Sequence, residues 1–276
     1  MTKKKTKTAK KASKKKNYVE KTWGGIKKIK FPAITLINLL MLIIGGFIIL
    51  NLIVAFGIYF WGWNNAFTQN ISGFFSYPVV IIDRKTNINY KDYQNQIETL
   101  RRYHNLQSVI TNIPEYDLSG QTGVDFFQVT KKNILKTMIE DKIIEKINQE
   151  RYNYQPSRKE IQAEAEKIAN LNSGQIKTEQ KLEQIYDMDF DRFQNQIVKK
   201  YVQREFLKQS LIDQGLIVEQ AGAADQCEFN CWLNQELKKH EIIVLPDQYI
   251  WDQKTGRLYF KNTNLNEYEQ TVYNKN

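Results

Sequence analysis

One long apolar run divides the pattern of hydrophobic and polar positions in this chain. Residues 31–61 contain no Asp, Glu, Lys or Arg, and the next charged residue is Asp83. A helix that crosses the hydrocarbon core needs about 20 mostly apolar residues, and soluble helices rarely stay apolar on every side for that length. Trp61 and Trp63 lie where an aromatic belt at the membrane interface is expected. The pattern therefore predicts one transmembrane helix within residues 31–63.

After Pro78 the pattern changes to short β-branched runs and longer amphipathic helices. The most regular helix is expected at residues 125–151, where Leu135, Ile139, Ile143 and Ile147 recur every four positions. The other expected elements are a strand at 79–82, a turn at 83–87, a helix at 89–105, a loop at 106–123, helices after Ser157, Thr178 and Asp189, a helix at 228–240, a strand at 242–245 and a hairpin of 249–251 with 258–260.

These elements predict a mainly α fold with a small β element formed by the N- and C-terminal strands. An isolated strand is unstable, so the strands at 79–82 and 242–245, which are similar in length and composition, are expected to pair. Residues 216–226 are too few to hold two bodies far apart, so we expect the C-terminal segment to fold back onto the helices. Ser157 and Glu160 have the spacing of a helix capping box.

Charge is concentrated before the apolar run. Residues 1–30 hold thirteen Lys and a single acid, which gives +12, and the whole chain is +10, so residues 31–276 carry −2. Because cytoplasmic flanks are enriched in Lys and Arg, the basic tail is expected in the cytoplasm and the C-terminal part outside it. A topology signal with solvated charge is the simplest interpretation of the tail. The alternative interpretation gives the tail a function, which is attraction to anionic lipid head groups. A nucleic-acid partner of the tail is not expected.

The apolar run is also expected to remain attached to the mature chain. It is longer than the core of a secretory signal peptide, and no small-residue cleavage site follows it. No Cys lies near it that could carry a lipid anchor. We therefore interpret the run as an uncleaved signal anchor.

The cysteines and histidines do not form a recognisable reactive site. Cys227 and Cys231 are interpreted as small, partly buried side chains, with a disulfide as the alternative, because two cysteines within one helix are poorly placed for a bridge. They have no nearby His, so no zinc site is predicted. His104 and His240 fall on separate helices and are expected at the surface or at helix ends. The sequence predicts no catalytic residues, no metal and no cofactor.

Three stretches together resemble a known family. They are PVVIIDRKTNINYKDYQNQIETL (78–100), KKNILKTMIEDKIIEKINQERYNYQPSRKEIQAEAEKI (131–168) and FDRFQNQIVKKYVQREFLKQ (190–209). In order and spacing, and in their place after a signal anchor, they are similar to the SurA N-terminal domain of the SurA, PpiD and PrsA group of extracytoplasmic chaperones. The resemblance covers most of residues 78–209, and residues 228–251 look like the returning C-terminal helix and strand of that family.

The chain departs from the family in three places. Residues 84–87 occupy a turn where the family usually has Gly, and the insertion at 106–123 is longer than usual. Many members carry a parvulin-type prolyl isomerase domain after the closing helix, but here only residues 216–226 separate that helix from the next. Eleven residues cannot hold such a domain, and its motifs are absent.

The resemblance implies a membrane-anchored extracytoplasmic chaperone that binds unfolded or newly translocated polypeptide. The expected organisation is a basic cytoplasmic tail (1–30), a transmembrane signal anchor (31–63), a linker (64–77), a SurA-N-like helical chaperone domain (78–261) and a polar tail (262–276). The residues expected to line a peptide-binding groove, each of which would otherwise be ordinary core, are Tyr93, Ile97, Met138, Phe193, Ile197 and Tyr201.

Two other classes of function remain open on the sequence. One is a structural or assembly subunit that holds a single fixed partner. The other is a prolyl isomerase with an unrecognised active site. The expected partners of the chaperone itself are unfolded polypeptide and the lipid bilayer.

Overall fold

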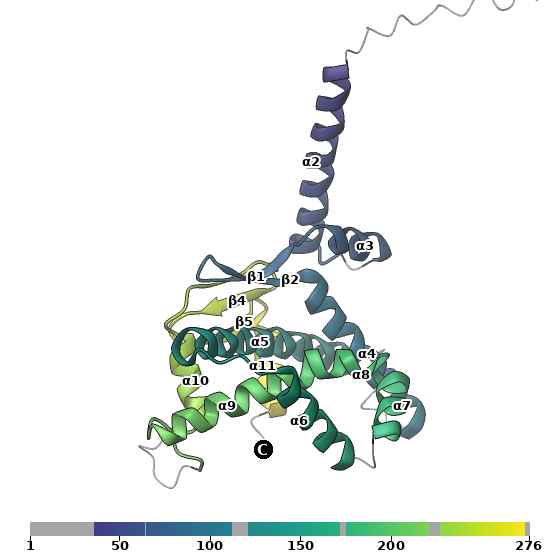
Figure 1. Cartoon of the computed structure of the whole chain (residues 1–276). Helices are drawn as coiled ribbons and strands as arrows, with labels where there is room; N and C mark the ends of the chain where they lie inside the picture. Colours follow the sequence, from purple (N-terminus) through teal and green to yellow (C-terminus); the bar gives the residue numbers. More distant parts are fainter. Residues whose placement is uncertain (1–35, 64, 112–120, 172–174, 221–226, 274–276) are drawn as a thin grey trace, which may run out of the picture. The chain divides into compact units, whose positions relative to one another are not determined.

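The computed structural model describes residues 36–63, 65–111, 121–171, 175–220 and 227–273 (Figure 1). The basic tail expected at residues 1–30 lies outside these ranges. The chain divides into two units, residues 1–52 and residues 53–276. Helix α2 (Leu36–Phe60) begins in the first unit, where its large apolar side chains are exposed. Its segment Asn38–Phe60 is long and apolar enough to cross a membrane, as the pattern predicts.

The second unit is mainly helical. Its helices are α3 (Ala66–Phe74), α4 (Tyr90–Thr111), α5 (Gln121–Tyr152), α6 (Arg158–Leu171), α7 (Gln175–Tyr186), α8 (Phe190–Phe193), the π-helical turn η2 (Gln194–Val198), α9 (Lys199–Asp213), α10 (Phe229–Leu237) and α11 (Thr263–Tyr273). Its strands are β1 (Pro78–Ile82), β2 (Thr86–Asn89), β3 (Ile242–Val244), β4 (Tyr249–Asp252) and β5 (Arg257–Phe260).

A three-stranded antiparallel sheet joins the two ends of this unit. Its strand order is β2-β1-β3, with Val80 opposite Val244 and Ile82 opposite Ile242. The predicted pairing of the N- and C-terminal strands is therefore confirmed. The predicted hairpin is also present as β4 and β5, whose turn contains Gly256 with a φ of 66°. Glycine suits that position because it has no Cβ to oppose the left-handed backbone.

The turn after β1 is tighter than the pattern predicts. Asp83 and Arg84 have φ values of 50° and 57°, and these two left-handed residues reverse the chain sharply enough for a second strand to begin at Thr86. Asn89 is the last residue of β2, and α4 begins directly after it at Tyr90. The loop expected at 106–123 is also shorter, because α4 continues to residue 111 and α5 begins at residue 121.

The main core forms around α5. The stripe of Leu135, Ile139, Ile143 and Ile147 is buried, as its spacing of four residues predicts. The α5 stripe belongs to a core that also contains residues of α4, α9, α10 and the strands. Arg151 of α5 also forms an ion pair with the buried carboxylate of Glu236 in α10. These contacts hold the C-terminal segment against the helices, as the fold-back hypothesis requires.

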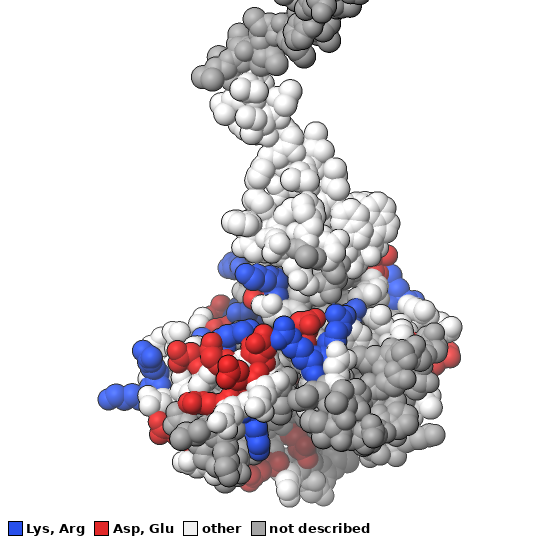
Figure 2. Space-filling model, turned by 90° about the vertical axis from the view of Figure 1, so that its right-hand side faces the viewer, with Lys and Arg blue, Asp and Glu red and all other residues white. Residues whose placement is uncertain are grey.

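The end of α2 belongs to the same core. Val54 and Ile58 are buried in it, and a Cβ at Gly57 would overlap the ring of Trp63. The linker expected at residues 64–77 contains α3, which Asn65 and Thr68 begin with a reciprocal capping box. The chain is therefore already folded well before residue 78. Figure 2 shows this region as an uncharged surface, with charged side chains beginning on the elements that follow it.

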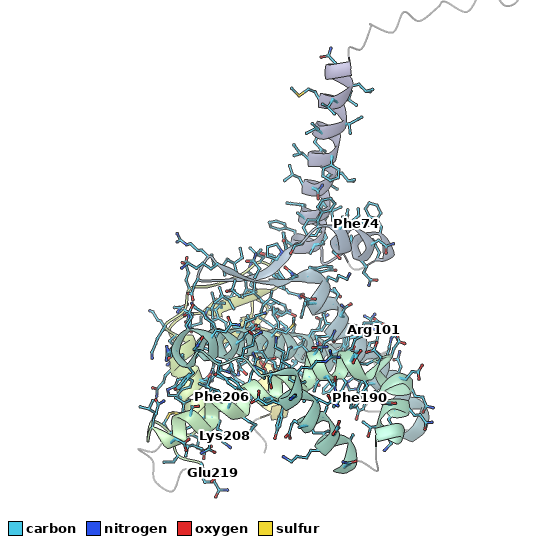
Figure 3. All side chains as sticks on the ribbon, in the orientation of Figure 1. Phe74, Arg101, Phe190, Phe206, Lys208 and Glu219 are labelled. Carbon is cyan, nitrogen blue, oxygen red and sulfur yellow. A yellow bond between two sulfur atoms is a disulfide. The ribbon has the colours of Figure 1, made fainter. Side chains whose placement is uncertain are left out.

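A second, smaller core lies among α6, α7, α8 and η2. It contains Ile161, Ala165, Leu182, Met188, Phe193 and Val198. The predicted capping box opens α6, since Ser157 N donates to Glu160 Oε2 at 2.7 Å and Glu160 N donates to Ser157 Oγ at 3.3 Å. Phe190, labelled in Figure 3, is the first residue of α8, and Phe206, also labelled there, lies within α9.

The polar tail expected at residues 262–276 is a helix through Tyr273. Asn266 of α11 accepts from Phe260 N and donates to Phe260 O, at 3.0 and 2.9 Å, and so continues the edge of β5. Glu269 forms an ion pair with the buried Lys132 of α5. Both contacts depend on the tertiary fold, so the polar composition of the segment gave no sign of them.

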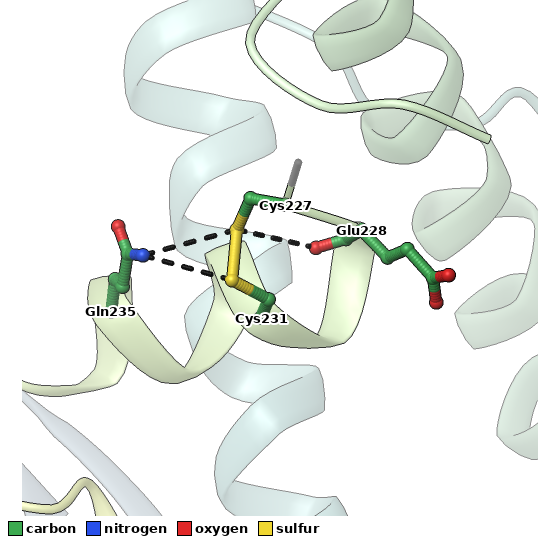
Figure 4. The surroundings of a disulfide bond; sticks show 4 residues. All are labelled: Cys227, Glu228, Cys231 and Gln235. Carbon is green, nitrogen blue, oxygen red and sulfur yellow. Dashed lines mark hydrogen bonds between the residues drawn. A yellow bond between two sulfur atoms is a disulfide. The ribbon is translucent and has the colours of Figure 1, made fainter. Parts of the chain in front are cut away.

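The two cysteines form a disulfide (Figure 4), so their interpretation as separate side chains is wrong. Cys227 precedes Glu228, which has the extended backbone of a helix N-cap, and only Cys231 lies inside α10. The Cα atoms are therefore 5.5 Å apart, which is within the usual range for a bridge. The expected helix begins one residue earlier than the observed one, but Cys227 lies outside it in either case.

Candidate functional site

The six residues expected to line one groove lie in different parts of the second unit. Tyr93 and Ile97 are buried in the main core, and Phe193 is buried in the smaller one. Met138 is half-buried beside the main core. Ile197 and Tyr201 are exposed, at 45% and 44%. The structure therefore does not bring these six side chains together into a single groove.

The π-helical turn η2 explains why the expected stripe is broken. The pattern places Phe193, Ile197 and Tyr201 on one face because they are four residues apart. In η2, however, Lys199 N donates to Gln194 O five residues earlier, which adds one residue to the turn. Val198 therefore takes the buried position below Phe193, and Ile197 is turned toward solvent. The sequence carries apolar residues at both spacings, so its pattern is consistent with either helix type.

Met138 instead lines a shallow groove of about 170 Å³ between β2, α5 and α9, here called the β2 groove. The groove is lined by polar, apolar and charged side chains, among them Asn87 and Ile88 of β2, Met138, Asp141 and Glu145 of α5, and Lys200 of α9. Ile88 is buried and Met138 half-buried, so the apolar part is small. Methionine is unbranched and polarisable, and therefore adapts to side chains of different shape.

Ion pairs form much of the rim of this groove. Lys200 Nζ lies 3.2 Å from Asp141 Oδ2, and Lys142 Nζ lies 2.7 Å from Glu145 Oε2. Lys199 approaches Glu145 more loosely, at 3.8 Å. Partly exposed pairs of this kind contribute little to stability, about 0–1 kcal/mol each. They can therefore exchange partners with charged groups of a bound segment at small cost.

Strand β2 borders the groove and is an edge strand. The sheet order is β2-β1-β3, and within the described ranges no strand pairs with the outer side of β2. An edge strand offers backbone N–H and C=O groups to which an extended peptide can add as a further strand. The edge and the groove together form the candidate functional site.

Two groups that the sequence singled out are structural. His104 is buried rather than exposed, with its ring edge-on to that of Phe126, and burial lowers its pKa. His240 follows α10 and hydrogen-bonds to Asp83. Among the residues that the structure describes, no group of three or more His, Cys, Asp or Glu side chains is placed to hold a metal ion.

Comparison of the chain with family models, with curated proteins and with solved structures found no match. The resemblance to the SurA N-terminal domain therefore rests on the three stretches of sequence and on the order of their elements.

Proposed function

We propose that this protein is a membrane-anchored, extracytoplasmic chaperone-like protein that binds extended segments of unfolded or newly translocated polypeptide. The observation that carries the proposal is the outer edge of β2, with which no strand in the described part of the chain pairs, beside a groove containing Met138. Binding is passive and reversible, and it needs no nucleotide.

The mode of binding follows from the chemistry of the site. Backbone hydrogen bonds to β2 do not depend on the sequence of the client, which suits a protein that accepts many segments. Met138 provides an apolar contact that adapts to different side chains. The lysines and acids of the rim offer both signs of charge. Weak contacts of these three kinds favour fast release.

The order of elements supports the family proposal. A strand and a tight turn lead into α4, the long helix α5 follows, and Ser157 caps the next helix. After the closing helix, α10 and β3 return to pair with β1, which is the role that the resemblance gives to the C-terminal segment. The second strand, β2, and the π turn in the closing helix are features of this chain that the resemblance does not imply.

Two observations support the extracytoplasmic placement of the second unit. The Lys-rich tail precedes the candidate span, and such tails remain in the cytoplasm. The Cys227–Cys231 disulfide lies after the span, and disulfides persist mainly in oxidising compartments outside the cytoplasm. The two observations are independent, and both support the proposal of an extracytoplasmic C-terminal part.

Site-specific crosslinking in the native membrane tests the proposal. A photo-crosslinking amino acid replaces Asn87, which is exposed on β2 at the groove, and a control variant carries it at Lys254 in the β4–β5 turn. We expect the Asn87 variant to trap many different polypeptides, more of them when secretion is active, and the Lys254 variant to trap few. A single stoichiometric partner at Asn87 contradicts the proposal and favours an assembly subunit.

A second measurement separates binding from catalysis. The purified full chain in lipid nanodiscs is added to an aggregating client and, separately, to a proline-containing peptide. We expect slower aggregation and no acceleration of cis–trans exchange. Acceleration that single substitutions in this chain abolish contradicts a purely passive role.

A further inference from the structure

The region where the candidate span meets the folded unit exposes an unusual number of aromatic side chains. Phe60 and Trp61 are 59% and 63% exposed, and Phe67 of α3 is also exposed. Phe74, labelled beside α3 in Figure 3, is 86% exposed. Large rings that lie next to an apolar span are typical of the membrane–water interface.

Helix α3 buries two hydroxyl side chains and exposes two aromatic rings. Its polar Thr68 and Ser72 are buried, whereas Phe67 and Phe74 point outward. The buried hydroxyls are satisfied locally, because Ser72 Oγ donates to Gln69 O at 2.9 Å and Thr68 Oγ1 to Asn65 O at 3.0 Å. The exposed surface of α3 thus combines the two rings with polar Gln69 and Asn70, as expected of a helix at the membrane–water interface. The aromatic surface is continuous along the chain with the span, so lipid is the environment that it fits.

A cavity of about 300 Å³ lies beside this aromatic surface. Its lining includes Tyr59 of α2 and Trp61 directly after it, Gln94 of α4, Gln128 and Lys131 of α5, and Gln248 before β4. No Asp or Glu is among its lining residues. Asp247, the nearest acid in sequence to Gln248, pairs instead with Lys261. The cavity thus combines aromatic walls, amide groups and one cation.

Lys131 is a half-buried cation that has no counter-ion among the residues that the structure describes. Its Nζ lies 3.3 Å from Gln128 Oε1 and 5.8 Å from the centre of the Phe127 ring, and no described carboxylate forms an ion pair with it. Glu98, which is on the same helix as Arg101, pairs with Arg101 and Arg102. Burial and, secondarily, the charge of Arg101 lower the pKa of Lys131. A partly desolvated ammonium beside a second cation is stabilised by an anion.

From this geometry we infer that the cavity binds the head group of an anionic phospholipid, with Lys131 as the counter-ion of its phosphate and the glutamine amides as further hydrogen-bond donors. The exposed rings of Phe60, Trp61 and Phe74 contact the acyl-chain region next to it. This site is separate from the β2 groove. It would fix the second unit against the outer surface of the bilayer instead of leaving it tethered only by the span.

Native mass spectrometry of the full chain in mild detergent tests this site, with phosphatidylglycerol and phosphatidylcholine as the added lipids. We expect the wild-type chain to retain one phosphatidylglycerol more tightly than phosphatidylcholine. Lys131→Gln removes the cation and should weaken that binding about tenfold, the loss of one charge-assisted contact. Lys131→Arg should keep the preference. Lys136→Gln, a control on α5 whose lysine pairs with Glu140, should also keep it.

A second variant distinguishes the loss of the cation from a loss of folding in Lys131→Gln. Gln94→Glu supplies the carboxylate that the cavity lacks, so it should lose the preference for the anionic lipid while its thermal unfolding temperature does not fall. The Lys-rich tail is present in every variant, and its lipid binding is therefore common to all of them. Unchanged phosphatidylglycerol binding in both variants overturns the inference. Binding of inorganic phosphate at Lys131 without a lipid preference overturns the lipid assignment as well.

Discussion

The carboxylate of Asp83 accepts a hydrogen bond from Nδ1 of His240 at 2.6 Å, although the two residues are 157 positions apart. Lys146 Nζ donates to the same oxygen at 2.5 Å, and the backbone N of Glu241 donates to the other at 2.9 Å. One turn residue thereby connects the β1–β2 hairpin, helix α5 and the entry to β3. Its backbone is left-handed, which holds the carboxylate at the meeting point of these elements.

The charge of Asp83 should make the protein sensitive to acid. Burial alone raises the pKa of Asp83, but the hydrogen bonds from Lys146, His240 and Glu241 N outweigh it and lower the pKa to about 2. Because the folded pKa is below the unfolded one, this stabilisation is present above about pH 4 and is lost as the pH falls toward 2. It amounts to about 2 kcal/mol. Denaturant unfolding of the full chain in detergent at several pH values measures the loss.

Asp83→Asn is the matched control for that experiment. Asparagine tolerates a left-handed backbone, so the variant removes the charge and leaves the turn intact. It should be less stable at neutral pH and should lose less stability between pH 4 and pH 2 than the wild type. Parallel pH curves for the two proteins would contradict the role assigned to Asp83.

The fold-back of the C-terminal segment predicts an unequal effect of two leucine substitutions. Leu237 of α10 is fully buried in the main core, whereas Leu216, in the connection after α9, is 54% exposed. Leu237→Ala should lower the free energy of unfolding by about 2–5 kcal/mol because it leaves a cavity. Leu216→Ala should change it by less than about 0.5 kcal/mol. Similar values for both would show that α10 does not pack on the helices.

The π turn makes a comparable prediction for neighbouring residues. Val198→Ala should destabilise the protein by about 1–3 kcal/mol, because it removes buried methyl groups from the smaller core. Ile197→Ala removes a larger but exposed side chain and should cost less than about 0.5 kcal/mol. Thermal unfolding of the two variants ranks them. A regular α-helix with the spacing of four residues gives the opposite order, which makes the comparison decisive.

The disulfide allows a test of topology. In intact spheroplasts a membrane-impermeant maleimide should fail to label Cys227 and Cys231 until an impermeant reductant is added, and should label both afterwards. The bond closes a short loop, so its reduction should cost about 2 kcal/mol and leave the protein folded. Labelling without reductant would show that the bond does not form. Labelling only after the cells are lysed would place these residues in the cytoplasm.

Local signals account for the parts of the fold that the sequence predicted. The spacing of Leu135, Ile139 and Ile143 requires one buried face, and the Ser157–Glu160 box acts within a single turn. The pairing of the strands at 79–82 and 242–245 was predictable because the sequence pattern offers no other strand that matches either in length and composition. The helical stripe and the capping box depend on residues close in the sequence, and the strand pairing depends on the lack of another suitable strand.

The remaining features depend on contacts that the sequence pattern does not encode. The position of Ile197 depends on one extra residue in a helix whose apolar side chains fit both spacings. Helix α11 depends on Lys132 and Phe260, and the disulfide depends on where α10 begins. The candidate site was only partly predicted for the same reason: Met138 was identified, but β2 and its free edge follow from two left-handed residues in a turn.

Under the proposed export of the second unit, the antiparallel pairing of β1 with β3 also determines when the sheet can be completed. Strand β1 would then leave the membrane before β3, and the residues that complete its sheet follow more than 150 positions later, the separation of Asp83 and His240. At synthesis rates of about 5–20 residues per second, β1 waits roughly 8–30 seconds for that partner. Throughout this interval the strand would have an open edge on the outer side of the membrane, so the newly made protein would itself, for a time, be a chain that needs protection from aggregation.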